Sequence, residues 1–159
     1  MSFSSDVKSE LCRQEGSGSC CRLAECYGVL LYCNTFSADQ VRIVTEHREF
    51  AARIARLFLE TFGLALDNAG ETDGPGKLIL TLRGREALGR IYAAFGYDAM
   101  TSLSLHVNLG VLEEDCCRAA FLRGAFLAGG SMIDPEKRYH WAWILSFFPM
   151  CVQTNQYPR

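Results

Sequence analysis

The chain has 159 residues, of which 49% are hydrophobic and 21% are charged, and its net charge is −2. This length accommodates one domain, or one domain with part of a second, and the apolar fraction is typical of a packed core rather than of a disordered chain. The slightly negative charge excludes a bulk positive field, so any contact with nucleic acid would have to use a local face.

The sequence also argues against a membrane-spanning or secreted protein. The apolar run "WAWILSFFPMCV" is too short to span a bilayer and contains a proline. The N-terminus "MSFSSDVKSELCR" is charged where a signal peptide needs an apolar core. We therefore expect a cytoplasmic protein, associated with the nucleoid if it binds DNA, whose cysteines are free thiols.

The N-terminal part predicts two helices followed by a strand. The first helix is expected at residues 3–14, with Ser4 or Ser5 as its N-cap. The second follows the break "EGSGSC" and runs from about Cys20 to Tyr32. The turn-rich segment "CNTFSADQ", with room for a short strand, leads into "QVRIVT", whose alternation of polar and apolar residues predicts a strand.

A strongly amphipathic helix, a hairpin and a short helix are expected next. The segment "EHREFAARIARLFLETFG" predicts a helix that ends at a C-cap glycine, Gly63. Its apolar stripe consists of Phe50, Ile54, Leu57, Phe58 and Phe62. Residues 64–83 predict a hairpin with the loop "NAGETDGPG", and residues 84–97 predict the short helix.

After residue 97 the order of elements begins again. "TSLSLHVN" predicts a strand, a helix is expected from roughly Glu114 to Ala128, and "RYHWAWIL" predicts another strand. We therefore divide the chain into an N-terminal helix with a first half (1–97), a connector with the start of a second half (98–145), and an irregular tail (146–159).

The two copies are related by a repeated segment. "CCRLAECYGVLL", starting at Cys20, matches "CCRAAFLRGAFL", which starts at Cys116, in its Cys-Cys-Arg leader and in its small residues. Small residues four positions apart lie on one face of a helix and allow a second backbone to approach closely. The sequence therefore predicts that the two helices pair through these small side chains: Ala24, Gly28, Ala120, Gly124 and Ala128.

The repeated segment also carries a family resemblance. "AAFLRGAFLAGGS" resembles the signature helix of the LAGLIDADG homing endonucleases, whose two copies pack side by side at the centre of a pseudosymmetric saddle. "CCRLAECYGVLLY", "EHREFAARIARLF" and "CCRAAFLRGAFLAGGSMIDPEKRYH" resemble the WhiA family of sporulation regulators, over the chain from Ser2 to about His140. The resemblance implies an α+β fold of αββαββ-type half repeats, with central paired helices and an antiparallel sheet.

In the WhiA family, a degenerate LAGLIDADG domain precedes a DNA-binding helix-turn-helix. The resemblance implies a non-enzymatic part of a transcription regulator for sporulation and cell division, serving as a scaffold or an auxiliary surface for DNA or protein. The final residues, "WAWILSFFPMCVQTNQYPR", show neither the apolar stripe of a second long amphipathic helix nor a helix-turn-helix. We therefore expect a truncated second repeat. An apolar surface at Trp141, Trp143 and Phe147 favours a dimerisation or protein-interaction module as the alternative.

A metal-dependent nuclease is a less favoured alternative. LAGLIDADG nucleases hold a divalent metal with one carboxylate at the foot of each signature helix, and a hard cation needs such oxygen ligands. Alignment to the family pattern places Cys33 and Gly129 at these two positions, and the nearest acids, Asp39 and Asp134, fit turns or caps better. We therefore expect no enzymatic activity and no cofactor.

The cysteines offer a second candidate metal site. A twofold axis could bring Cys20 and Cys21 near Cys116 and Cys117 and form a four-thiol zinc site, but buried thiols at two helix N-termini are the favoured interpretation. We therefore expect no bound metal.

The expected DNA contacts come from polar residues on the sheet. In the endonuclease fold the sheets form the concave face that contacts DNA, and the polar positions of the predicted strands would face it. A half-exposed antiparallel sheet shows the same pattern without binding DNA, so the expected contact is weak and auxiliary. The candidates are Arg42, Lys77, Thr81, Arg83, Ser104 and Arg138, with Gln40 and Ser102 beside them.

Overall fold

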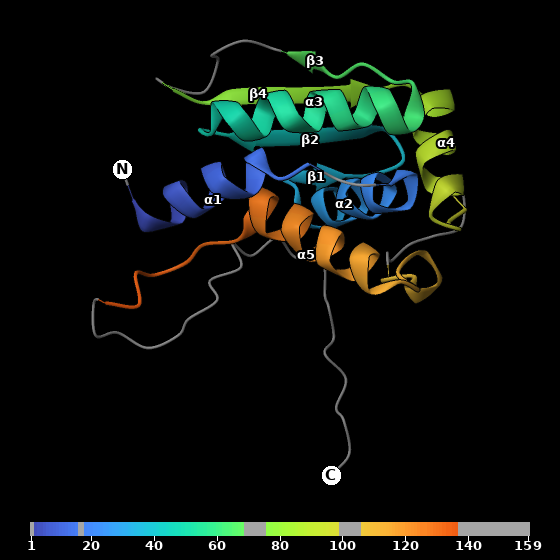
Figure 1. Cartoon of the computed structure of the whole chain (residues 1–159). Coiled ribbons are helices and arrows are strands. Elements are labelled where there is room, and N and C mark those ends of the chain that lie inside the picture. Colours follow the sequence, from blue (N-terminus) through green and yellow to red (C-terminus); the bar gives the residue numbers. More distant parts are fainter. Residues whose placement is uncertain (1, 16–17, 69–75, 99–105, 137–159) are drawn as a thin grey trace.

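The computed structural model describes residues 2–15, 18–68, 76–98 and 106–136. Its elements follow the order α1 (Phe3–Arg13), α2 (Ser19–Tyr32), β1 (Thr35–Phe36), β2 (Gln40–Thr45), α3 (Arg48–Phe62), β3 (Asp67–Asn68), β4 (Leu78–Arg83), α4 (Arg85–Ala94), the 3-10 turn η1 (Leu109–Val111) and α5 (Asp115–Gly129). Figure 1 shows the sheet and α3 on one side of the molecule and the helices α1, α2 and α5 on the other.

The helix ends agree with the sequence patterns, with one correction. Ser2, rather than Ser4 or Ser5, is the N-cap of α1, and its side chain accepts a hydrogen bond from the amide of Ser5. The helix therefore starts at Phe3, one residue after its cap. Gly63 ends α3 in the left-handed conformation with φ of 67°, as predicted for a C-cap glycine.

The four strands form an antiparallel sheet in the order β1-β2-β4-β3. Val41 lies opposite Leu82 and Ile43 opposite Leu80, so these apolar side chains share one face. The predicted hairpin is present, because β3 pairs antiparallel with β4, although β3 is only two residues long. Although Ile79 of β4 is buried on the opposite face, these four side chains form an apolar face that helices cover.

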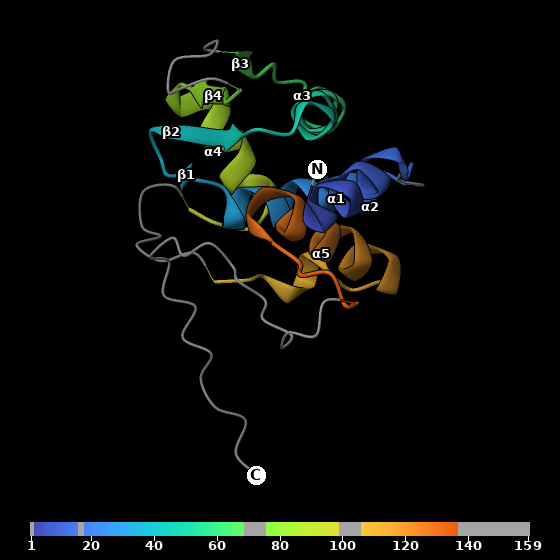
Figure 2. The same ribbon diagram turned by 90° about the vertical axis from the view of Figure 1, so that its left-hand side faces the viewer.

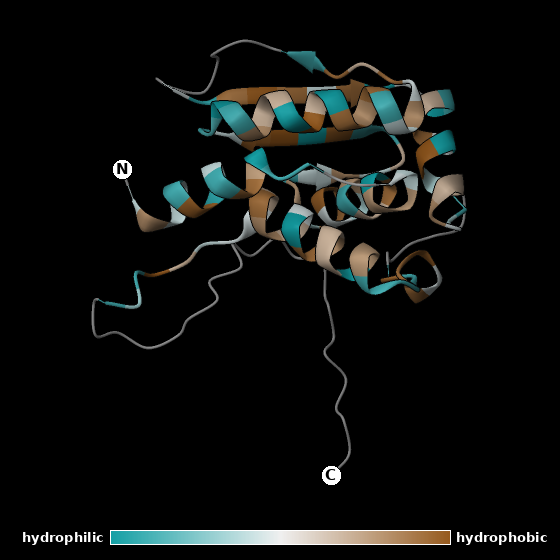
Figure 3. Ribbon diagram, viewed as in Figure 1, coloured by the Kyte–Doolittle hydropathy of each residue, from teal (hydrophilic) through white to brown (hydrophobic). Residues whose placement is uncertain are grey.

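Helix α3 packs its apolar stripe on this face. All five predicted stripe residues are buried in the core, namely Phe50, Ile54, Leu57, Phe58 and Phe62. The colouring by hydropathy shows the same division, with hydrophilic positions of α3 on the side away from the sheet (Figure 3). Helix α4 closes the same core with Leu88 and Ile91, both fully buried.

Helix α5 lies beside α2 along most of its length. Figures 1 and 2 show the two helices adjacent in views turned by 90°. Residues 106–108, expected at the end of a strand, have no regular structure because Asn108 caps the turn η1 instead. The rest of that predicted strand, and the one expected at 138–145, lie outside the described residues.

The segment that leads into α5 is fixed by a buried tyrosine. The ring of Tyr27, on α2, stacks on Phe95 with 4.3 Å between the ring centroids. Its hydroxyl contacts the hydroxyl of Tyr97 and accepts a hydrogen bond of 2.6 Å from the amide of Asn108. These bonds connect α2 directly to the segment that precedes α5.

Among the described residues, no helix combines the length and the apolar character that a membrane crossing requires.

Candidate functional site: the paired helices and the polar sheet face

Two glycines bring the backbones of α2 and α5 into direct contact. A Cβ atom built on Gly28 would lie 2.1 Å from the carbonyl oxygen of Phe121, and one built on Gly124 would lie 2.1 Å from the carbonyl oxygen of Glu25. Both distances are far below van der Waals contact, so neither position has room for a side chain. The residues expected to pair the two helices are therefore brought together in the structure.

The two contacts are equivalent under the internal repeat. In the repeat, Gly28 corresponds to Gly124 and Glu25 corresponds to Phe121, 96 positions later. Gly28 contacts the carbonyl oxygen of Phe121, and Gly124 contacts the carbonyl oxygen of Glu25, so the two contacts are the same contact made in each direction. Ala24 and Ala120 are fully buried in this seam, and Ala128 is half-buried near its end. The helices consequently form a symmetric pair around a local twofold axis.

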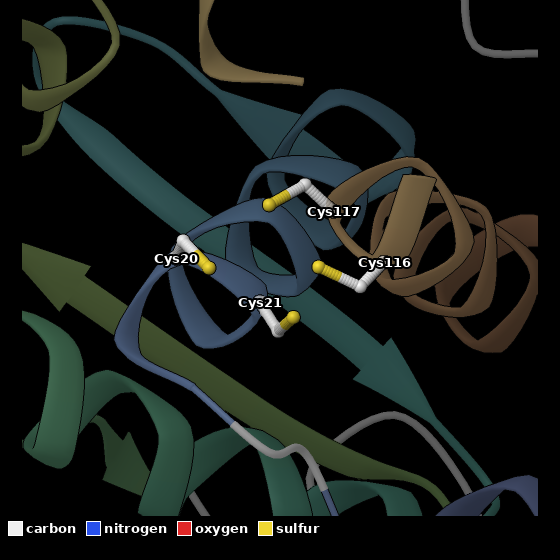
Figure 4. Close-up of side chains that lie close together, drawn as sticks. All are labelled: Cys20, Cys21, Cys116 and Cys117. Atoms are coloured by element: carbon white, nitrogen blue, oxygen red, sulfur yellow. The ribbon is translucent and has the colours of Figure 1, made fainter. Parts of the chain in front are cut away.

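The N-terminal ends of the paired helices carry a cluster of four thiols. The Sγ atoms of Cys20, Cys21, Cys116 and Cys117 all lie within 4.8 Å of one another. Figure 4 shows the four sulfur atoms converging between the first turns of α2 and α5. Cys21 and Cys117 are buried, whereas Cys20 and Cys116 are exposed, so only half of the cluster agrees with the buried thiols expected from sequence.

The environment separates the acidities of these thiols. Hydrogen bonds from Cys117, and then from Cys21, lower the pKa of Cys20. Desolvation raises the pKa of Cys21 and of Cys117. The exposed Cys20 is therefore a stronger acid than the buried Cys21 and Cys117.

At the opposite ends, the helices meet without carboxylates. Cys33 is the C-cap of α2 and Gly129 is the last residue of α5, and a Cβ on Gly129 would lie 3.1 Å from the carbonyl oxygen of Tyr32. The thiol of Cys33 donates to the carbonyl oxygens of Leu30 and Thr35, and burial raises its pKa to about 12. A neutral thiol and a glycine do not fit the hard divalent cation of a LAGLIDADG nuclease.

The acids nearest to these ends are placed in turns. Asp134 accepts a hydrogen bond of 3.0 Å from the amide of Glu136, which is the arrangement of an Asx turn. Asp39 is exposed in the turn before β2, where its amide donates to the hydroxyl of Ser37.

A buried ionic cluster lies beside the helix seam, and sequence reasoning missed it. Glu25 is 1% exposed and receives two hydrogen bonds from Arg53, of 2.6 and 2.9 Å, and two from Arg123, of 3.1 and 2.9 Å. Arg53 also donates to the carbonyl oxygens of Cys12 and Gln14 at the end of α1. Hydrogen bonding to Glu25 raises the pKa of Arg53 above its ordinary value.

The signal for this cluster was present in the sequence as two charges inside apolar helices. Glu25 interrupts "LAECYGVLL" and Arg123 interrupts "AFLRGAFL". A charge in an otherwise apolar helix requires a buried partner. The identity of that partner depended on tertiary contacts between α2, α3 and α5.

The polar residues predicted for DNA contact partly share one sheet face. The register places Arg42 opposite Thr81, and Gln40 opposite Arg83, on the face away from α3. Lys77 is half-buried immediately before β4. Asp67 of β3 pairs with Thr81, so the same row also carries an acid. Ser102, Ser104 and Arg138 lie outside the described residues.

Comparison with known proteins identifies this arrangement. A family model described as the WhiA LAGLIDADG-like domain matches residues 118–144. The chain is 38% identical to a probable cell division protein WhiA of Ruminiclostridium cellulolyticum over 88% of the chain and 47% of that protein. It is 32% identical to the protein of the same name from Alkaliphilus oremlandii, over 88% of the chain and 48% of that protein.

Solved structures support the fold. The crystal structure of the N-terminal LAGLIDADG domain of DUF199/WhiA aligns with a TM-score of 0.58 at 16% identity, covering 87% of this chain and 63% of that one. Full-length DUF199/WhiA from Thermatoga maritima aligns with a TM-score of 0.57, also at 16% identity, covering 87% of this chain and 43% of that one.

The paired helices and antiparallel sheet define an α+β LAGLIDADG-like domain. The similarity in sequence is narrower than the fold: the chain is similar to WhiA proteins over 88% of its own length, and residues 118–144 match the WhiA LAGLIDADG-like domain. It spans about half the length of the curated relatives that it matches.

Proposed function

We propose that this chain is a non-catalytic domain of a WhiA-like DNA-binding transcription regulator that acts in cell division and sporulation control. The domain holds the regulator's architecture together and offers the polar face of its sheet as an auxiliary surface for DNA. The relatives' name, probable cell division protein WhiA, supports the cellular role.

The observation that carries a non-catalytic role is the chemistry at the feet of the paired helices. Cleavage by this fold needs two carboxylates there, and this chain has the buried thiol of Cys33 and the backbone of Gly129. The carboxylate of Asp134 is engaged in an Asx turn, and Asp39 lies exposed in the turn before β2. We expect no plasmid cleavage in the presence of Mg²⁺.

The sheet face supports a weak contact with the DNA backbone. Arg42 and Arg83 lie on one face of the sheet: Arg42 is directly opposite Thr81, and Arg83 is two residues further along β4, opposite Gln40. Cations and hydroxyls suit phosphate oxygens, which supply affinity without reading the base sequence. The acid at Asp67 and the net charge of −2 limit the strength of this contact.

The test is the salt dependence of DNA binding by the double variant Arg42→Ala/Arg83→Ala. Fluorescence anisotropy with a labelled duplex should show weaker binding than for the unchanged chain, by a similar factor on unrelated DNA sequences. The slope of log K against log salt should become shallower by about 2, one unit for each lost phosphate contact.

Arg56→Ala is the matched control for this experiment. Arg56 is an exposed arginine on α3, which packs on the opposite face of the sheet, so its loss should leave the slope unchanged. Equal slopes for the double variant, the control and the unchanged chain would refute the DNA surface and favour the protein-interaction alternative. Plasmid cleavage that Asp39→Asn or Asp134→Asn abolishes would refute the non-catalytic role.

A further inference from the structure

The thiol cluster at the N-terminal ends of α2 and α5 has the composition and size of a metal site. Its four Sγ atoms lie within 4.8 Å of one another. Tetrahedral zinc with four thiolates has Zn–S bonds of about 2.3 Å, which places the sulfur atoms about 3.8 Å apart. Rotation of the two exposed side chains, Cys20 and Cys116, could close this difference without moving the helices.

The local backbone favours thiolates at this position. The cysteines are the second and third residues of each helix, where amide N–H groups lack the usual i−4 partners, although the amide of Cys117 donates to the carbonyl oxygen of Glu114. Neither helix has a side-chain cap, since Gly18 and Glu114 at the two N-cap positions make no such hydrogen bond. Two positive helix ends therefore converge on the sulfur atoms and stabilise negative charge there.

The ligand set selects the class of metal. Four thiolates are soft ligands and fit zinc in a closed structural site, whereas Mg²⁺ requires oxygen ligands. The buried pair, Cys21 and Cys117, would anchor the ion, and the exposed pair provides its entry path. Binding would release the thiol protons, form four Zn–S bonds and involve no oxidation.

We propose that Cys20, Cys21, Cys116 and Cys117 bind one zinc ion, which fastens the N-terminal ends of the paired helices to each other. The ion joins segments that are 96 residues apart in the chain, one from each half of the repeat. It therefore locks the duplicated architecture at the end opposite to Cys33 and Gly129. This site is independent of the proposed DNA surface.

The experiment is a metal analysis of the full chain purified under reducing conditions. Elemental analysis should find about one zinc per chain. Replacement of zinc by Co²⁺ should produce thiolate-to-cobalt charge-transfer bands and the d–d bands of a tetrahedral site. A chelator should lower the Tm of the zinc-loaded protein.

The test variant is Cys20→Ser/Cys116→Ser, which changes only exposed side chains and so preserves the buried packing. It should lose the zinc and the cobalt bands, and its Tm should no longer respond to the chelator. Cys12→Ser is the matched control, because Cys12 is a half-buried thiol on α1 outside the cluster. The control should keep the metal and both responses.

Three results would overturn the proposal. The first is a reduced, folded chain that binds neither zinc nor Co²⁺. The second is a double variant that holds zinc with the same stoichiometry and affinity as the unchanged chain. The third is disulfide formation within the cluster during purification under reducing conditions, detected by intact mass, because a disulfide would consume the ligands.

Discussion

Gly28 and Gly124 are the residues on which the contact between α2 and α5 depends. At each position the missing side chain leaves space for a carbonyl oxygen of the opposite helix, 2.1 Å from where a Cβ would lie. A glycine inside a helix costs about 0.5–1 kcal/mol relative to alanine, so its use at both equivalent positions is explained by the close approach. Cα–H groups facing carbonyl oxygens add a weak attraction.

We predict that Gly28→Ala lowers the free energy of unfolding by about 2–3 kcal/mol, because the new methyl group meets the backbone of α5 and cannot rotate away. Urea denaturation followed by circular dichroism measures this change. Gly89→Ala is the matched control, since Gly89 lies within α4 and its added Cβ would meet nothing within 4 Å beyond its chain neighbours and the backbone of its own helix.

The control should be stabilised by about 0.5–1 kcal/mol, which is the ordinary gain from replacing a helical glycine by alanine. The two substitutions therefore have opposite predicted signs. A stabilised Gly28→Ala variant would show that α2 and α5 do not approach each other as closely as described.

At the scale of elements, Glu25 connects four helices through one carboxylate. It pairs with Arg53 on α3 and Arg123 on α5, and Arg53 continues to the carbonyl oxygens at the end of α1. The carboxylate and the two guanidinium groups are largely removed from water, so the carboxylate depends on the two arginines for its hydrogen bonds. The cluster fixes how the helices are oriented as well as how closely they pack.

We predict that Glu25→Gln lowers the free energy of unfolding by about 3–5 kcal/mol, because it leaves two guanidinium groups without their buried counterion. The measurement is chemical denaturation. Glu60→Gln is the control. The carboxylate of Glu60 is half-exposed, with its Oε2 3.8 Å from Nε of Arg22 and its Oε1 4.0 Å from Nε of Arg56. Loss of these surface ion pairs should lower the free energy of unfolding by less than about 1 kcal/mol. Equal effects of the two changes would contradict a structural role for the buried cluster.

At the scale of the whole molecule, the periodic elements could be predicted from sequence and the contacts between distant elements only in part. The stripe of α3, its C-cap Gly63 and the alternation in β4 report local geometry, so their patterns were sufficient. The internal repeat made the pairing of α2 with α5 predictable. The N-cap of α1 was misplaced because several serines stand side by side, and only one of them caps.

The site was predictable to a similar degree. The repeat placed the small residues and the four cysteines at equivalent positions, but the separation of the sulfur atoms depends on how the helices cross. The ionic cluster was missed because Arg53 lies on an amphipathic helix where an arginine usually faces water. Pairing over long sequence distances is what one sequence specifies least directly.

Helices α2 and α5 are related by the internal repeat and meet at Gly28 and Gly124. Nuclear Overhauser spectroscopy on the isotope-labelled chain can detect this contact. We expect strong cross-peaks from the Hα atoms of Gly28 to the amide of Ala125, and from those of Gly124 to the amide of Val29. A Cβ built on Gly28 would lie 2.8 Å from the nitrogen of Ala125, and one built on Gly124 would lie 3.1 Å from the nitrogen of Val29. Absence of both cross-peaks, in a spectrum that shows the contacts within each helix, would contradict the paired architecture.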